Sequence, residues 1–310
     1  MSEPKKGLLV MHYGTPATID DVAPYYTHIR HGRPPTPELL QDLIDRYNAI
    51  GGPSPLTKIS EAQAAGIQQG LSKRGIETDL YIGTKHTNPF IADVVTQMAE
   101  DGIEEAVGVV LAPHFSTFSI AQYKKYAMES HAENGKDMKF ALLERWGTLP
   151  AFIDALAERV SEQMAGWDPT STLVIFSAHS LPMRALASGD PYPDELMATS
   201  QLVADKLGIP RWTFAYQSAS TTGEPWLGPD ILEVIERQAA GKVTNVLSCT
   251  VGFISDHLEV LYDLGIETRA KCEELGLNFR VARVINADDV VMDALAEQLV
   301  PLFSSLTATV

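Results

Sequence analysis

Short apolar runs rich in β-branched residues alternate with longer segments of helical spacing along almost the whole chain. This alternation is typical of a parallel sheet whose faces are covered by helices. Eight runs qualify as strands, four early and four late: 8–11, 80–83, 107–112, 140–144, 173–177, 213–216, 246–251 and 279–284. The order predicts an α/β protein with two four-stranded units.

A polar stretch at 166–171, GWDPTS, separates the two groups of strands. We therefore predict an N-terminal domain at residues 1–165 and a C-terminal domain at residues 166–285, which suits a chain of 310 residues. A last amphipathic helix within 286–310, capped by Asn286, is free to pack back on either domain, the first included.

Composition narrows the class of protein. A formal charge of -16 and a pI near 4.9 argue against general binding to nucleic acid or to an anionic membrane. The two cysteines, Cys249 and Cys272, have no CxxC spacing, so neither a disulfide framework nor an iron-sulfur site is indicated. No apolar run approaches the length of a membrane span or of a signal-peptide core, which predicts a cytoplasmic protein without a stable membrane anchor.

Three carboxylates recur every fourth residue in the segment DHLEVLYDLGIE, at Glu259, Asp263 and Glu267. On a helix they form one acidic stripe, and each like-charged pair costs about 0.2–0.5 kcal/mol in an isolated helix. The stripe is either a solvated face of an acidic protein or a place that attracts a cation.

His179 ends the run TLVIFSAH and lies between Ser177 and Ser180. A histidine after a strand is commonly structural, but a neutral imidazole also accepts protons and binds borderline metals such as Fe2+. With Glu259 from another strand end it makes an imidazole and carboxylate pair, which suits a transient ferrous site better than a closed four-ligand zinc site. In open parallel sheets ligands bind beyond the carboxyl ends of the strands, where Tyr13, His114 and His179 are expected.

Positive charge gathers near the N-terminus, in YYTHIRHGRPPTPELLQDLIDRYNAI, around Arg30, Arg33 and Arg46. Arginine captures carboxylates in a bidentate manner, so this patch either binds an acidic ligand or balances nearby Asp42 and Asp45. The sequence contains no GxSxG elbow, phosphate loop, GxGxxG fingerprint, HExxH or EF-hand loop, which argues against the corresponding hydrolases and nucleotide enzymes.

The chain resembles the ferrochelatase family, specifically its soluble Gram-positive type that inserts iron into coproporphyrin III. The resemblance runs nearly end to end, through GLLVMHYGTP, YYTHIRHGRPP, DRYNAIGGPSPL, VVLAPHFSTFS, SAHSLP, GDPYPDEL, QSASTTGEPWLGPD and VGFISDHLEVLYD. It implies two Rossmann-like, chelatase-type domains facing across a porphyrin cleft. It also implies an enzyme of heme biosynthesis with Fe2+ as substrate, no tightly bound cofactor, and transient contact with neighbouring heme-pathway enzymes.

Carried over by motif, the resemblance assigns His179 and Glu259 to catalysis and Fe2+ binding, and Tyr13 to the opposite face of the macrocycle as a proximal iron ligand. Asp263 and Glu267 match an outer site that holds hydrated Mg2+ in relatives. The implied substrate contacts, besides Tyr13, are Arg30, Arg46, Tyr47, Ser54 and Tyr123.

Two departures from relatives concern the proposed cleft. His12 stands where MAYGTP is usual, and QSASTT stands where relatives read QSEGNT. His12 is therefore expected to add a ligand or to alter hydrogen bonding on the proximal side. A protoporphyrin IX ferrochelatase, a cobalt chelatase and a non-catalytic tetrapyrrole or heme-delivery protein remain as alternatives.

Overall fold

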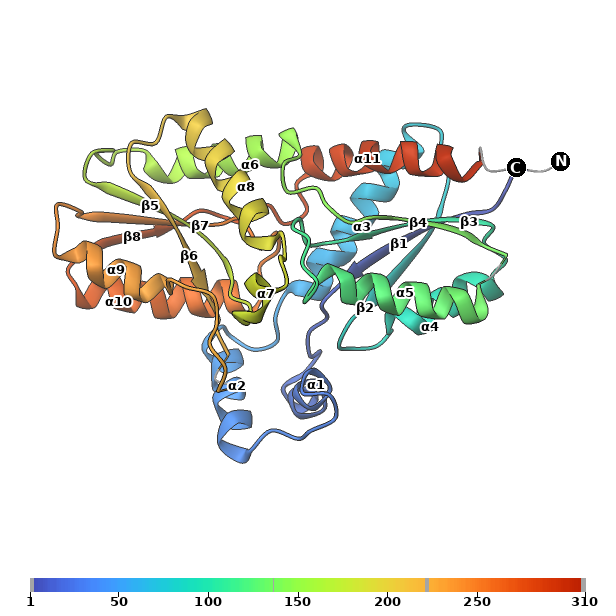
Figure 1. Cartoon of the computed structure of the whole chain (residues 1–310), viewed down its shortest axis with the longest axis horizontal. Coiled ribbons are helices and arrows are strands. Elements are labelled where there is room, and N and C mark those ends of the chain that lie inside the picture. Colours follow the sequence, from blue (N-terminus) through green and yellow to red (C-terminus); the bar gives the residue numbers. More distant parts are fainter. Residues whose placement is uncertain (1–2, 136, 221–222, 308–310) are drawn as a thin grey trace. The chain divides into compact units, whose positions relative to one another are not determined.

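The computed structural model describes residues 3–135, 137–220 and 223–307. The chain forms two compact units, each built on one four-stranded parallel sheet with helices beside it (Figure 1). The first unit takes the residues up to Ala112, Ser119–Trp146 and the residues from Asn286 onward. The second unit takes Pro113–Phe118 and Gly147–Ile285.

All eight predicted strands are present, and each sheet has the same internal order. The first sheet runs β2-β1-β3-β4 and the second β6-β5-β7-β8. Their bounds are β1 (Lys6–His12), β2 (Asp79–Thr84), β3 (Glu105–Val110), β4 (Lys139–Leu143), β5 (Thr172–His179), β6 (Trp212–Gln217), β7 (Asn245–Thr250) and β8 (Asn278–Val281).

The central strands are buried on both faces because helices cover both sides of each sheet. Leu8 to Met11 on β1 and Val174 to Phe176 on β5 have no exposed surface. Near-continuous apolar runs are what a doubly covered parallel strand requires, and they made these strands recognisable in the sequence.

The helices separate by unit as well. In the first unit they are η1 (Ile19–Asp21), α1 (Val22–Ile29), α2 (Pro37–Ala49), α3 (Leu56–Ser72), α4 (Ile91–Glu100), α5 (Ile120–Asn134) and α11 (Asp289–Thr307). In the second they are α6 (Pro150–Met164), α7 (Arg184–Ala187), α8 (Tyr192–Leu207), α9 (Ile231–Ala239), the π-helix η2 (Val260–Thr268) and α10 (Arg269–Glu274).

The boundary between the units differs from the expected one at residues 165 and 166. Helix α6 belongs to the second unit because it packs against α8 and β7, so the chain crosses between Trp146 and Gly147 instead. The loop Pro113–Phe118 also belongs to the second unit, although the elements before and after it lie in the first.

Helix α11 returns to the first unit, where it packs against α3, β3 and β4. Its cap is Asp288 and not Asn286, since Asp288 Oδ1 accepts the N–H groups of Val290 and Val291 at 3.1 and 3.2 Å. Among the described residues it is the helix whose length and composition would also allow a membrane span. Its apolar residues, such as Leu295 and Leu299, are buried in the first unit.

Candidate functional site

His179 lies at the carboxyl end of β5 with its imidazole held in one orientation. Its Nδ1 donates to the carbonyl of Ser180, because a carbonyl only accepts, and this leaves Nε2 with a lone pair. The Tyr192 hydroxyl donates to the His179 carbonyl at 3.1 Å. The ring centres of Trp226 and Phe253 lie 6.2 and 6.3 Å from that of the imidazole, so apolar side chains border His179.

Glu259 faces the free nitrogen of His179. Its Oε1 is 3.7 Å from His179 Nε2 and its Oε2 is 3.8 Å from Nε2 of His257. Both the His179 and Glu259 side chains are about one-third exposed, at 32% and 33%. The second unit therefore brings the two predicted catalytic residues together within reach of solvent.

The charges in this cluster support one another. Burial disfavours ionisation of Glu259, but His179, His257 and the Ser218 hydroxyl outweigh it and lower the pKa of Glu259 to about 2. Burial likewise opposes the charged form of His257, yet its interactions with Glu259 raise the pKa of His257 above its ordinary value. Its neighbours thus favour the anionic form of Glu259, and the carboxylate in turn favours the charged form of His257.

The acidic stripe follows a π-helix and not the α-helix that the four-residue spacing predicted. Glu259 precedes η2, Asp263 lies in its first turn and Glu267 near its end. Asp263 is only 5% exposed and accepts the Ser218 hydroxyl, whereas Glu267 is exposed. Within residues 3–135, 137–220 and 223–307, no cluster of three or more His, Cys, Asp or Glu side chains has the geometry of a metal site.

The loop Pro113–Phe118 is fixed to α8 and the turn before it by two carboxylates. Asp190 Oδ2 accepts from Ser116 Oγ, Thr117 N and Thr117 Oγ1 at 2.6–3.0 Å, and Glu195 Oε2 accepts from Phe115 N at 2.7 Å. His114 is buried, its Nε2 lies 2.7 Å from Thr199 Oγ1, and burial lowers its pKa to about 3. His114 is therefore packed into the protein and does not present its imidazole beside His179.

Tyr13 lies in the first unit, just beyond β1, with 39% of its surface exposed. Its ring contacts His86 at 4.5 Å, and the Lys85 ammonium lies 5.6 Å from its centre. Tyr123 on α5 is almost fully buried, and the same ammonium is 5.4 Å from its ring. Two of the expected substrate contacts, Tyr13 and Tyr123, therefore gather around Lys85.

The other expected substrate contacts lie on or beside α1, α2 and α3. Arg30 directly follows α1, and its guanidinium lies 5.7 Å from the centre of the Tyr26 ring. Its buried Nε has no hydrogen-bond partner in the part of the chain described. Arg46 pairs with Asp42 at 3.1 Å. Of the remaining two, Tyr47 lies 3.4 Å from the Thr15 hydroxyl, and Ser54 accepts the N–H of Leu56; both side chains are buried.

His12 is a buried side chain next to Tyr13. Its Nδ1 accepts the N–H of Gly14 at 3.3 Å, and burial lowers its pKa to about 4. It thus supports the turn that carries Tyr13. Of the QSASTT departure, residues 221 and 222 lie outside the described residues, while Ser218 binds Asp263.

Three residues near these sites were missed by the sequence reasoning: His257, Lys85 and His86. His257 was available as a signal, since it stands two residues before Glu259 in a turn after a buried strand. Lys85 and His86 directly follow β2, at the same carboxyl edge as Tyr13, which is where ligand-binding side chains gather in such sheets.

The sequence also matches a known protein family. The family model described as ferrochelatase matches residues 5–300. The chain belongs to the ferrochelatase family. Among relatives of this ferrochelatase, a coproporphyrin III ferrochelatase from Geobacillus sp. (strain WCH70) is 46% identical over 302 residues, covering 96% of this chain and 97% of the relative. A ferrochelatase from Herpetosiphon aurantiacus is 42% identical, covering 94% of this chain and 97% of the relative.

Solved structures resemble the fold of this ferrochelatase at low sequence identity. SirB from Bacillus subtilis, solved with Fe3+, has a TM-score of 0.63 and 11% identity, and the match covers 98% of both chains. A multi-domain protein from Deinococcus radiodurans, described as similar to chelatases, has a TM-score of 0.55, with 94% of this chain and 54% of that chain covered. These likenesses support the two-sheet, chelatase-type architecture.

Proposed function

We propose that this ferrochelatase inserts Fe2+ into coproporphyrin III to give Fe-coproporphyrin III. The observation that carries the proposal is the His179 and Glu259 pair in a chain that is similar to coproporphyrin III ferrochelatases over 96% of its length. In this proposal the protein acts in the cytoplasm and takes both porphyrin and iron as substrates.

The ligand geometry of the pair suits an incoming ferrous ion. Divalent first-row ions lie about 2.0–2.2 Å from imidazole nitrogen and carboxylate oxygen, so two such atoms 3.7 Å apart are within reach of one ion. Nε2 of His179 and Oε1 of Glu259 would replace water on the iron. One imidazole and one carboxylate leave the other coordination positions for water and then for the pyrrole nitrogens.

Metallation also requires that two pyrrole N–H protons leave the macrocycle while iron–nitrogen bonds form. Once the iron has passed to the pyrrole nitrogens, the lone pair of His179 Nε2 is free again, because Nδ1–H stays bound to a carbonyl, and it would accept one of these two protons. The other proton would pass to water, since both side chains of the pair are about one-third exposed. Glu259 stays ionised because of its low pKa, so its charge would favour the imidazolium that forms. Tyr13, Arg30, Arg46, Tyr47, Ser54 and Tyr123 are assigned to porphyrin binding, with Tyr13 as proximal ligand of the product iron.

In this proposal Asp263 and Glu267 attract the hydrated Fe2+ ion as it approaches Glu259. Glu267 is exposed and lies beyond Asp263 along η2, so a hydrated ion would meet it in solvent before reaching Glu259. A hydrated Mg2+ ion at this outer site remains part of the proposal.

The test is anaerobic incubation with Fe2+ and either coproporphyrin III or protoporphyrin IX, followed by absorption. We expect metallation of coproporphyrin III to be faster. His179→Ala should bind porphyrin with unchanged fluorescence quenching but lose insertion by at least about 100-fold, the lower range for a positioned proton acceptor. His131→Gln, a change in the first unit, is the control. Porphyrin binding without metallation by the unmodified protein would instead indicate a carrier, and near-normal turnover of His179→Ala would remove the assignment of that residue.

A further inference from the structure

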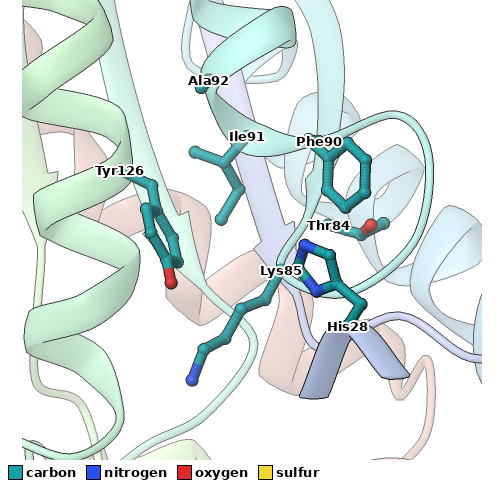
Figure 2. Close-up of a pocket in the computed structure, with 7 residues that line it drawn as sticks. All are labelled: His28, Thr84, Lys85, Phe90, Ile91, Ala92 and Tyr126. Carbon is teal, nitrogen blue, oxygen red and sulfur yellow. The ribbon is translucent and has the colours of Figure 1, made fainter. Parts of the chain in front are cut away.

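A cavity of about 190 Å³ opens in the first unit beside Lys85. Figure 2 shows the residues that line it: His28, Thr84, Lys85, Phe90, Ile91, Ala92 and Tyr126. The wall is mainly hydrocarbon, supplied by Phe90, Ile91 and Ala92. In the same view the Lys85 stem passes between His28 and Tyr126 and carries its ammonium to the Tyr126 side (Figure 2).

Lys85 is a buried cation without a carboxylate partner among the described residues. Its side chain and backbone together are 8% exposed, and no Asp or Glu oxygen of the described chain lies within 4.0 Å of Nζ. The ammonium lies instead over two aromatic rings, 5.6 Å from the centre of Tyr13 and 5.4 Å from that of Tyr123. A buried ammonium without a counter-charge is costly, so an anion that entered the cavity would supply the interaction that the described chain does not.

The backbone holds this lysine in place. Its N–H donates to the His12 carbonyl at 3.0 Å, and the next residue, His86, donates to the Tyr13 carbonyl at 3.0 Å. These bonds fix the point at the carboxyl edge of the sheet from which the lysine stem starts.

Besides Lys85, the cavity wall has three polar side chains that could donate a hydrogen bond to an anion: His28, Thr84 and Tyr126. His28 Nδ1 lies 3.0 Å from His86 Nδ1, and Thr84 Oγ1 is bonded to Thr87, so both are engaged. The Tyr126 hydroxyl makes no hydrogen bond within residues 3–135, 137–220 and 223–307. One ammonium and one hydroxyl above an apolar wall match a carboxylate on a hydrocarbon arm, whereas phosphate would require more donors.

We propose that the cavity beside Lys85 binds a carboxylate carried on a short apolar arm. The volume of the cavity limits the size of the arm. Propionate has five non-hydrogen atoms, and if each needs the roughly 30 Å³ that a water molecule occupies in the liquid, propionate needs about 150 Å³. This fits within the cavity of about 190 Å³. A whole macrocycle is far too large. The carboxylate comes either from a propionate side chain of the porphyrin, which rests on the function proposed above, or from a free short-chain acid.

The first arm of the test uses sodium propionate alone, titrated into the protein and followed by NMR of the 13C-labelled carboxylate. We expect saturable binding that weakens at least tenfold in Lys85→Met, which keeps most of the hydrocarbon stem, and that persists in Lys85→Arg. Lys125→Met, at an exposed lysine of the neighbouring α5, should bind as the unmodified protein does, and neutral propionamide should not bind. Circular dichroism checks that each variant is folded.

The second arm separates the two sources by measuring coproporphyrin III binding without iron. If a porphyrin propionate occupies the cavity, Lys85→Met weakens porphyrin binding and free propionate competes with porphyrin. If a free acid occupies it, propionate binds the porphyrin-loaded protein and porphyrin affinity is unchanged. Failure of the folded protein to bind propionate, with porphyrin affinity equal in Lys85→Met, overturns the inference. Failure of iron insertion by the unmodified protein overturns the proposed function instead and leaves propionate binding as a separate result.

Discussion

At the scale of single residues, the cluster around Glu259 depends on opposite charges placed in a partly buried environment. His257 Nδ1 lies 2.9 Å from the Ser255 carbonyl, and its other nitrogen faces Glu259. Since burial alone would lower the pKa of His257, the raised value depends on the neighbouring carboxylate. The imidazole therefore reports the charge of Glu259.

Replacing Glu259 by glutamine should lower the pKa of His257, because the amide removes the negative charge and leaves only the smaller effects of the Ser255 carbonyl and Asp263 to oppose burial. An NMR titration of the histidine ring protons between pH 5 and 9 measures the pKa of His257. Glu267→Gln, farther along η2 and exposed, is the matched control and should leave His257 unchanged. An unchanged His257 in Glu259→Gln would mean that the two side chains are not coupled in solution.

Glu267 permits a separate test of cation approach. An exposed charge contributes less than about 1 kcal/mol to an interaction, so Glu267→Gln should raise the KM for Fe2+ by roughly two- to fivefold and leave the KM for porphyrin unchanged. Glu273→Gln on α10 removes the same charge from another exposed position. An equal KM for Fe2+ in both variants would mean that Glu267 has no specific role in the approach of iron.

The residues of the candidate site were predictable to different degrees. His179 ends one buried strand and Glu259 comes after another. Both side chains can bind protons or metals, which an apolar run does not need, so both could be singled out from the sequence. The burial of Tyr47, Ser54 and Tyr123 was not readable, because helical spacing does not say which neighbour covers a given face. Lys85 was missed since its lack of a counter-charge exists only after folding.

At the scale of elements, α3 and α11 approach closely because α3 presents glycines to its partner. A Cβ on Gly70 would lie 2.5 Å from Cβ of Ala296, and one on Gly66 would lie 3.0 Å from Cβ of Met292. Arg74 then joins the helices through two hydrogen bonds to Asp293, at 2.9 and 2.8 Å. The missing side chains thus set the distance at which this ion pair forms.

Gly70→Ala distinguishes packing from helix propensity, since the two effects have opposite signs. Alanine favours an isolated helix by up to about 1 kcal/mol, whereas overpacking costs about 1–3 kcal/mol. Because the clash involves the Ala296 Cβ and the Asp293 backbone, we expect a net loss of unfolding free energy in urea titrations. Gln69→Ala, at the exposed neighbouring position, should be nearly neutral, and a stabilised Gly70→Ala would show that the helices separate easily.

Strands and most helices followed from local sequence, while two element-level features did not. The π-helix η2 was expected as an α-helix, because the spacing of its carboxylates does not reveal how the backbone winds. In the structure the Thr268 hydroxyl donates to the Asp263 carbonyl five residues earlier, and the Asp263 carboxylate accepts the Ser218 hydroxyl. The place of α6 was also misjudged, since a helix that follows one sheet in sequence gives no sign of covering the next.

At the scale of the whole molecule, the two units have separate cores. The core of the second unit gathers residues of β5, β6, β7, β8, α9, η2 and α10, and α11 contributes to the first unit alone. Damage to one core should therefore be visible in one sheet before the other.

Leu295→Asp should unfold the first unit selectively, because it places a carboxylate at a position with no exposed surface. Hydrogen exchange should show loss of protection in β1 and β3, with β5 and β7 still protected. Val290→Asp, on the same helix but 69% exposed, is the control and should leave both sheets protected. Equal loss of protection in both sheets would indicate a single cooperative unit.

Helix α11 is made after every other described element, yet it completes the core of the first unit. On the ribosome, the residues of the second unit are all available before α11 leaves the exit tunnel, so the sheet that carries His179 can close first. Vectorial synthesis usually favours the N-terminal part of a protein. Here the order is reversed, and the apolar face of α3 must be kept from aggregation until α11 has been synthesised.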